Sequence, residues 1–92
     1  MADIERVRQD IKDIANRPKA VRFEEIERIV NQLEALGHSV KSRTTKGGHS
    51  WIFRVDDQLF SISTHNPGSS QIKVAYVKAF LEAMINLGLY ED

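Results

Sequence analysis

The sequence predicts an α+β fold, in which an extra N-terminal helix precedes a unit of order α-β-β-β-α with a three-stranded antiparallel sheet. Apolar residues recur at spacings of three and four in three segments, which is typical of amphipathic helices. Before the last of these segments, three short runs rich in β-branched or aromatic residues are separated by turn residues, which is typical of strands. A sheet with both later helices on one face fits this order, and its other face is then free to meet a ligand.

The first helix is expected to run from Ile4 to about Asn16, because the residue before Pro18 avoids the helical region. Its narrow apolar stripe consists of Ile4, Val7, Ile11 and Ile14. This stripe is compatible both with docking on the core and with a homodimer formed through the helix. Residues 1–18 are therefore interpreted as an N-terminal helix with its linker, and residues 19–92 as one globular domain.

The second and last helices are expected over residues 22–36 and 73–87. The second has a wide apolar face made of Phe23, Ile26, Ile29, Val30, Leu33 and Leu36. The stripe of the last helix is made of Val74, Val77, Leu81 and Met84, widened by Phe80 and Ile85. Gly37 suits the left-handed position that follows a helix, and Gly88 is the expected stop of the last helix.

Three strands are expected over residues 38–43, 50–55 and 58–64, with a turn at 44–48 and a loop at 66–70. Asp56-Asp57 is a tight-turn signal between the second and third strands. These short connections favour an antiparallel meander.

The composition is that of an ordinary soluble protein, with 41% hydrophobic and 28% charged residues. The chain has no cysteine, which excludes disulfides and thiolate metal sites. No apolar run approaches the roughly 20 residues of a membrane span, and the acidic, amphipathic start does not resemble a signal peptide. We therefore expect a cytoplasmic protein without a membrane partner. No cofactor is expected, and no metal site, because the separations of the three histidines fit no recognised zinc spacing.

Positive charge is concentrated in the middle of the chain, although the net charge is zero. Residues 38–55 hold four basic residues and no acidic one, whereas residues 1–37 hold seven basic and eight acidic residues. The positive segment contains Lys46-Gly47-Gly48-His49, directly before an apolar strand. A solvated strand edge protected by Lys and Arg is the alternative interpretation, and charge alone favours it.

At Lys46-Gly47-Gly48-His49 the chain resembles the HicA-type toxins of bacterial and archaeal toxin–antitoxin systems. That family has a helix ending in Leu-Gly and then Lys-Gly-Ser-His at the head of the second strand; Leu36-Gly37 and the Gly-Gly-His segment are the matching pieces here. The resemblance continues at His65-Asn66-Pro67-Gly68 and at Ala75-Tyr76-Val77-Lys78, and it covers about residues 21–89. Gly48 departs from the pattern, since serine is usual there.

The resemblance implies a double-stranded-RNA-binding-like fold and a messenger-RNA endoribonuclease that needs no metal. It implies that a single histidine, at the position of His49, carries the activity. It also implies a HicB-type antitoxin as the partner, which covers the active face of the toxin.

The residues themselves suit this chemistry. An imidazole with a pKa of about 6.5 can take or give a proton near neutrality, and cations stabilise charge that develops on a phosphate. Lys46, Arg43 and Arg54 are the candidate cations. Gly47 and Gly48 have no side chains, so that an RNA backbone could approach closely and bond to their N–H groups. His65 is a candidate second proton-transfer group, with loop hydrogen bonding as the alternative. His38 is expected to be structural, beside a helix C-terminus.

Two other functions compete with RNA cleavage. The same fold also suits a non-catalytic RNA-binding module, because fold does not determine function. The other competing function is a protein-interaction module that uses the exposed sheet and the N-terminal helix. Trp51 shares a strand face with His49 and is a candidate for base stacking, with packing on the N-terminal helix or a partner subunit as the alternative.

Overall fold

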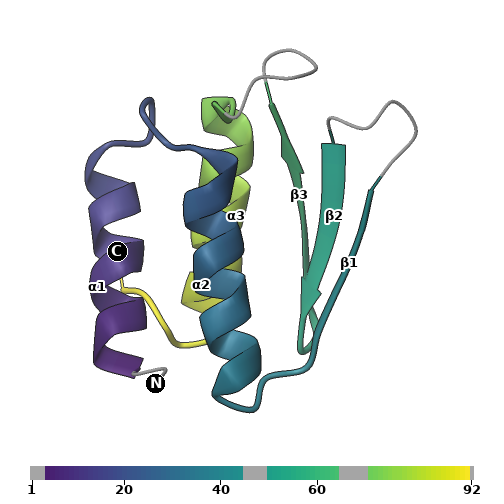
Figure 1. The fold of residues 1–92 in the computed structure, drawn as a ribbon. Helices are drawn as coiled ribbons and strands as arrows, with labels where there is room; N and C mark the ends of the chain where they lie inside the picture. The colour runs from purple at the N-terminus through teal and green to yellow at the C-terminus, as the bar shows by residue number, and fades with distance from the viewer. Residues whose placement is uncertain (1–3, 45–49, 65–70, 92) are drawn as a thin grey trace.

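The protein folds into three helices and a three-stranded antiparallel sheet, so that it has the predicted α+β fold (Figure 1). This computed structural model describes residues 4–44, 50–64 and 71–91. The elements in chain order are helix α1 (Ile4–Asn16), helix α2 (Phe23–Ala35), strand β1 (Val40–Thr44), strand β2 (Ser50–Val55), strand β3 (Gln58–Ser63) and helix α3 (Val74–Asn86). They form three layers, with α1 on one side, α2 and α3 in the middle and the sheet on the other side (Figure 1).

The strands pair in the order β1-β2-β3, as the meander requires. Val55 pairs with Gln58 across the two-residue hairpin between β2 and β3. Asp56 has a φ of 55° there, in the left-handed region that a two-residue hairpin demands of its first turn residue. The predicted tight turn at Asp56-Asp57 is confirmed.

Helices α2 and α3 cover one face of the sheet, and this layer contains the core. Alternate residues of β2 and β3 point into it: Phe53, Val55, Phe60 and Ile62 are all at most 4% exposed. Phe60 stacks on Phe53 with ring centroids 5.6 Å apart, and it forms a T-shaped pair with Phe80 of α3, with centroids 5.5 Å apart. The helices therefore pack on the aromatic face of the sheet, and no described helix covers its other face.

The N-terminal helix α1 docks on this core, from the side opposite the sheet (Figure 1). Val7, Ile11 and Ile14 are 0–1% exposed and belong to the same buried cluster as the apolar residues of α2 and α3. Of the two predicted uses of the stripe, docking on the core is the one observed. The buried side chains are unavailable to a second copy, so a homodimer through α1 would have to use its polar face.

The end of α2 is a glycine-terminated cap. Gly37 has a φ of +105°, which a glycine adopts at little cost. Its N–H bonds the carbonyl of Glu34 at 3.1 Å, and the N–H of His38 bonds the carbonyl of Leu33 at 3.0 Å. This paired arrangement satisfies two carbonyls that the helix end would leave without partners.

The second and last helices are each one residue shorter at both ends than predicted, and three predicted strand boundaries are wrong by one or two residues. The first strand begins at Val40 rather than at residue 38, because the N–H of His38 is used by the helix cap, where it bonds the carbonyl of Leu33. It ends at Thr44, which the sequence assigns to the following turn. Thr64 lies beyond β3 and forms an isolated bridge with Ile72.

Candidate functional site

The uncovered face of the sheet is the place where the described candidate residues meet. The side chains that point away from the helices form what we call the open face: Lys41, Arg43, Ser50, Ile52, Arg54, Leu59, Ser61 and Ser63. The strand register arranges most of them in two rows across the sheet, which are Lys41–Arg54–Leu59 and Arg43–Ile52–Ser61. Leu59 is 68% exposed, and Lys41, Arg43, Arg54 and Ser61 are exposed as well, whereas Ser63 at one end of the face is buried.

Three cations gather on the open face. Lys41, Arg43 and Arg54 are all exposed, and Lys41 lies directly opposite Arg54. Arg43 is the diagonal neighbour of Arg54, at a separation of about 7–8 Å between Cα atoms. The described strands contain no acidic residue. Like charges placed opposite each other destabilise a sheet, so this surface is arranged to favour a bound anion.

The carboxylate of Asp56, in the turn between β2 and β3, is held by two residues that follow α2. Its Oδ1 accepts a bond from the N–H of Ser39 at 3.0 Å, and its Oδ2 lies 2.7 Å from Nδ1 of His38. The contact with His38, and then the bond from Ser39, lower the pKa of Asp56 below its ordinary value of 3.8. The Asp56 carbonyl accepts a bond from Nε of Arg54 at 3.1 Å, which steadies that guanidinium. His38 is thus structural, as predicted, and its partner is a carboxylate as well as the end of α2.

Two serines lie at the other end of the open face. Ser50 and Ser63 are cross-strand partners, and their hydroxyl oxygens are 2.6 Å apart. Ser63 is buried, and its carbonyl accepts a bond from the N–H of Lys73 at 3.4 Å. The hydroxyl pair joins the start of β2 to the end of β3.

Trp51 is a packing residue on the helix side of the sheet. Its ring stacks on Phe23 of α2, with centroids 4.1 Å apart and an angle of 23° between the planes. The expectation that it packs on the N-terminal helix is therefore wrong, because α2 lies between α1 and the sheet (Figure 1). Its stacking partner is a phenylalanine of its own chain, so a base would have to displace Phe23 to occupy that face of the indole.

The remaining predicted site residues lie outside the described residues. These are Lys46, Gly47, Gly48, His49 and His65. Of the predicted set, Arg43 and Arg54 are described, and the structure brings them to the same face. Lys41 joins them there, although the sequence did not single it out.

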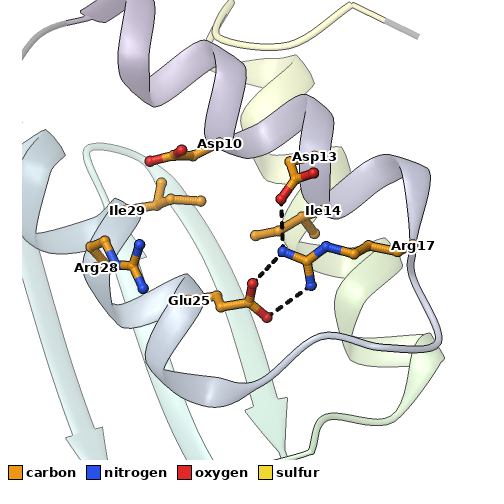
Figure 2. A pocket seen from close by; sticks show the side chains of 7 residues that line it. All are labelled: Asp10, Asp13, Ile14, Arg17, Glu25, Arg28 and Ile29. Carbon is orange, nitrogen blue, oxygen red and sulfur yellow. Dashed lines mark hydrogen bonds and ion pairs between the residues drawn. The ribbon is translucent and has the colours of Figure 1, made fainter.

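A second charged cluster lies between α1 and α2 (Figure 2). Arg17 forms a two-pronged ion pair with Glu25 and a single one with Asp13 at 2.8 Å. Glu25 also accepts a bond from the N–H of Arg22 at 2.8 Å. The hydrogen bond from Arg17 is the main reason why the pKa of Glu25 lies below 4.5, with a smaller contribution from the Arg22 N–H.

The cavity at this cluster has a volume of about 40 Å³, close to that of one water molecule. Asp10, Arg28, Ile14 and Ile29 complete its lining (Figure 2). The cavity is therefore too small for a substrate, and the ion pairs of the cluster connect α1 and the linker to α2.

Among the described residues, no three His, Asp or Glu side chains lie close enough together to hold a metal ion. Within the same residues, no helix is both long and apolar enough to cross a membrane. Comparison of the chain with protein-family models, with curated proteins and with solved structures finds no match.

Proposed function

We propose that the protein is a metal-independent endoribonuclease that cuts messenger RNA, of the kind found in HicA-type toxins. The observation that carries the proposal is the group of three exposed cations on the open face, in strands that contain no acidic residue. A phosphate backbone is the biological polyanion that such a surface suits best, since phosphate contacts supply most of non-specific nucleic-acid affinity.

The cations lie close in the chain to the proposed catalytic residue. Thr44 pairs with Trp51, so the strand ends that flank residues 45–49 in the sequence lie side by side. Arg43 is one residue from the end of β1, and His49 directly precedes Ser50, the first residue of β2. A phosphate held by Arg43 would therefore lie near the start of β2.

The proposed reaction needs two proton transfers. His49 takes the proton of the 2′-hydroxyl as its oxygen attacks the adjacent phosphorus, and the leaving 5′-oxygen receives a proton. A positioned general acid or base contributes about 10²–10⁴-fold to such a rate. Arg43, with Lys46, would stabilise the charge that develops on the phosphate, while His65 is the proposed second proton-transfer group.

The proposal includes a protein partner and a compartment. As a toxin, the chain would be held inactive in the cytoplasm by a HicB-type antitoxin. The alternative is a non-catalytic RNA-binding module, which the described cations favour equally because phosphate binding by them requires no histidine.

Controlled expression of the wild type and of His49→Ala tests the activity. The expected result is growth arrest with loss of RNA in the wild type alone, and cleavage by the purified wild type in the presence of EDTA. Circular dichroism and thermal unfolding verify that the variant is folded. Unchanged cleavage by folded His49→Ala would refute the catalytic assignment, and intact RNA that is bound by both proteins would establish the binding module instead.

A further inference from the structure

Strand β1 is an edge of the sheet, and its outer side is unpaired among the described strands. The strand order is β1-β2-β3, so β2 occupies one side of β1 only. Residues 41–44 are all exposed, and in Figure 1 the outer side of β1 faces away from the rest of the described chain. Such an edge presents a row of backbone donors and acceptors that can template a further strand.

The hydrogen bonds at the start of β1 identify which backbone groups face outward. The carbonyl of Ser39 accepts a bond from the N–H of Asp56 at 2.8 Å, so residue 39 points toward β2. Backbone groups alternate in an antiparallel strand. Residues 41 and 43 therefore also point toward β2, whereas Val40, Ser42 and Thr44 present their N–H and C=O groups to the outer edge.

The charged side chains next to this edge are positive. Lys41 and Arg43 flank it on the open face, two residues apart. On the other side of the sheet Ser42 and Thr44 are exposed, whereas Val40 is partly buried against the core. A strand added here would have room on both of its faces and two cations beside one of them.

We propose that the β1 edge binds an extended acidic segment of another protein, by backbone pairing with residues 40, 42 and 44. Acidic side chains at alternate positions of that segment would lie beside Lys41 and Arg43 on the open face. A second copy of β1 is a poor occupant, because antiparallel self-pairing would bring the Lys41 and Arg43 side chains of both copies together. RNA can use the two cations, but it cannot reproduce the strand's alternation of N–H and C=O groups.

The test uses the whole chain and a short fluorescent peptide in which glutamate alternates with threonine. Binding is measured by fluorescence anisotropy at low salt, against the same peptide with lysine in place of glutamate. A third peptide keeps the glutamates and carries N-methyl groups on the N–H groups that would face β1. We expect the glutamate peptide to bind, the lysine peptide not to bind, and N-methylation to weaken binding about tenfold or more per hydrogen bond lost.

A matched pair of variants tests the edge from the side of the protein. Ser42→Pro removes an outward N–H while leaving the pairing with β2 intact, and proline is tolerated at such edge positions. Ser42→Ala keeps the N–H and serves as the control. We expect Ser42→Pro to reduce affinity about tenfold and Ser42→Ala to leave it unchanged.

Three results would overturn the proposal. One is failure of the glutamate peptide to bind at low salt. Another is equal binding of the N-methylated peptide to the wild type, which would indicate charge attraction without strand pairing. The third is a dimer of the free protein that the peptide does not dissociate, which would make a second copy the occupant. None of these outcomes depends on RNA cleavage, so the proposal stands or falls separately from the ribonuclease activity.

Discussion

Removing the three cations of the open face should remove a defined part of the salt dependence of RNA binding. The change is the triple variant Lys41→Gln, Arg43→Gln, Arg54→Gln. For single-stranded nucleic acid, each phosphate neutralised by the protein contributes about −0.7 to the slope of log K against log salt. Three cations that each meet one phosphate therefore contribute about −2.1.

This slope corresponds to a large change in affinity over an accessible range. A fourfold increase in salt should weaken binding about 20-fold through these three contacts alone. The assay is fluorescence anisotropy of a labelled single-stranded RNA titrated with protein at several salt concentrations. We expect the slope of the triple variant to be less negative than that of the wild type by about 2.

The control is a second triple variant with the same change in net charge, Arg6→Gln, Lys12→Gln, Lys78→Gln. These exposed cations lie on α1 and α3, away from the open face. The control should keep the wild-type slope. Equal slopes for the wild type and the open-face variant, or equal losses in both triple variants, would refute the assignment of RNA to this surface.

Further predictions concern stability. Ile11→Ala should lower the free energy of unfolding, measured by urea denaturation, by about 2–5 kcal/mol, because the substitution opens a cavity where α1 meets the core. The control Lys12→Ala, on the same helix, should change this free energy by no more than about 0.5 kcal/mol. A loss below about 1 kcal/mol for Ile11→Ala would mean that α1 is not docked. Glu25→Gln should cost about 1 kcal/mol at neutral pH, discounted for the exposure of the pair with Arg17. Because folding lowers the pKa of Glu25, this contribution to stability is fully present above pH 4.5 and is lost as the pH falls through the lower pKa of the folded state. A difference in the free energy of unfolding between wild type and Glu25→Gln that persists in strong acid would contradict this linkage. Gly37→Ala should lower the melting temperature through a cost of about 1–2 kcal/mol, since its φ of +105° strains any residue with a Cβ, and an unchanged melting temperature would show that the cap relaxes.

The fold could be predicted from the sequence because its periodicities are local. Alternation along residues 50–55 and 58–63 identifies the buried face of each strand from single residues such as Phe53 and Ile62. The position of α1 was not predictable in this way. The same stripe serves docking and dimerisation, and only the partner surface on α2 and α3 decides between them.

The site could be predicted only in part, because it depends on register. Arg43 and Arg54 were identified by their charge, but nothing in the sequence states which residues lie opposite each other. Lys41 was missed for this reason, although its spacing of two from Arg43 in a strand was a usable signal. The pairing of His38 with Asp56 joins residues 18 apart and needs the hairpin to be placed against the turn after α2. For Trp51 the sequence left base stacking open beside packing on the N-terminal helix or a partner subunit, and it did not identify Phe23, which only the tertiary fold brings to the indole.

The position of α1 in the layer order has a consequence for how the chain is assembled during synthesis. Helix α1 is made before α2, yet part of its binding surface is α3, which follows the sheet in the chain. At translation rates of about 5–20 residues per second, the apolar side chains of α1 wait several seconds for that surface. In this interval Val7, Ile11 and Ile14 are covered by α2 at most. The nascent chain therefore leaves part of the apolar stripe of α1 exposed until translation reaches α3.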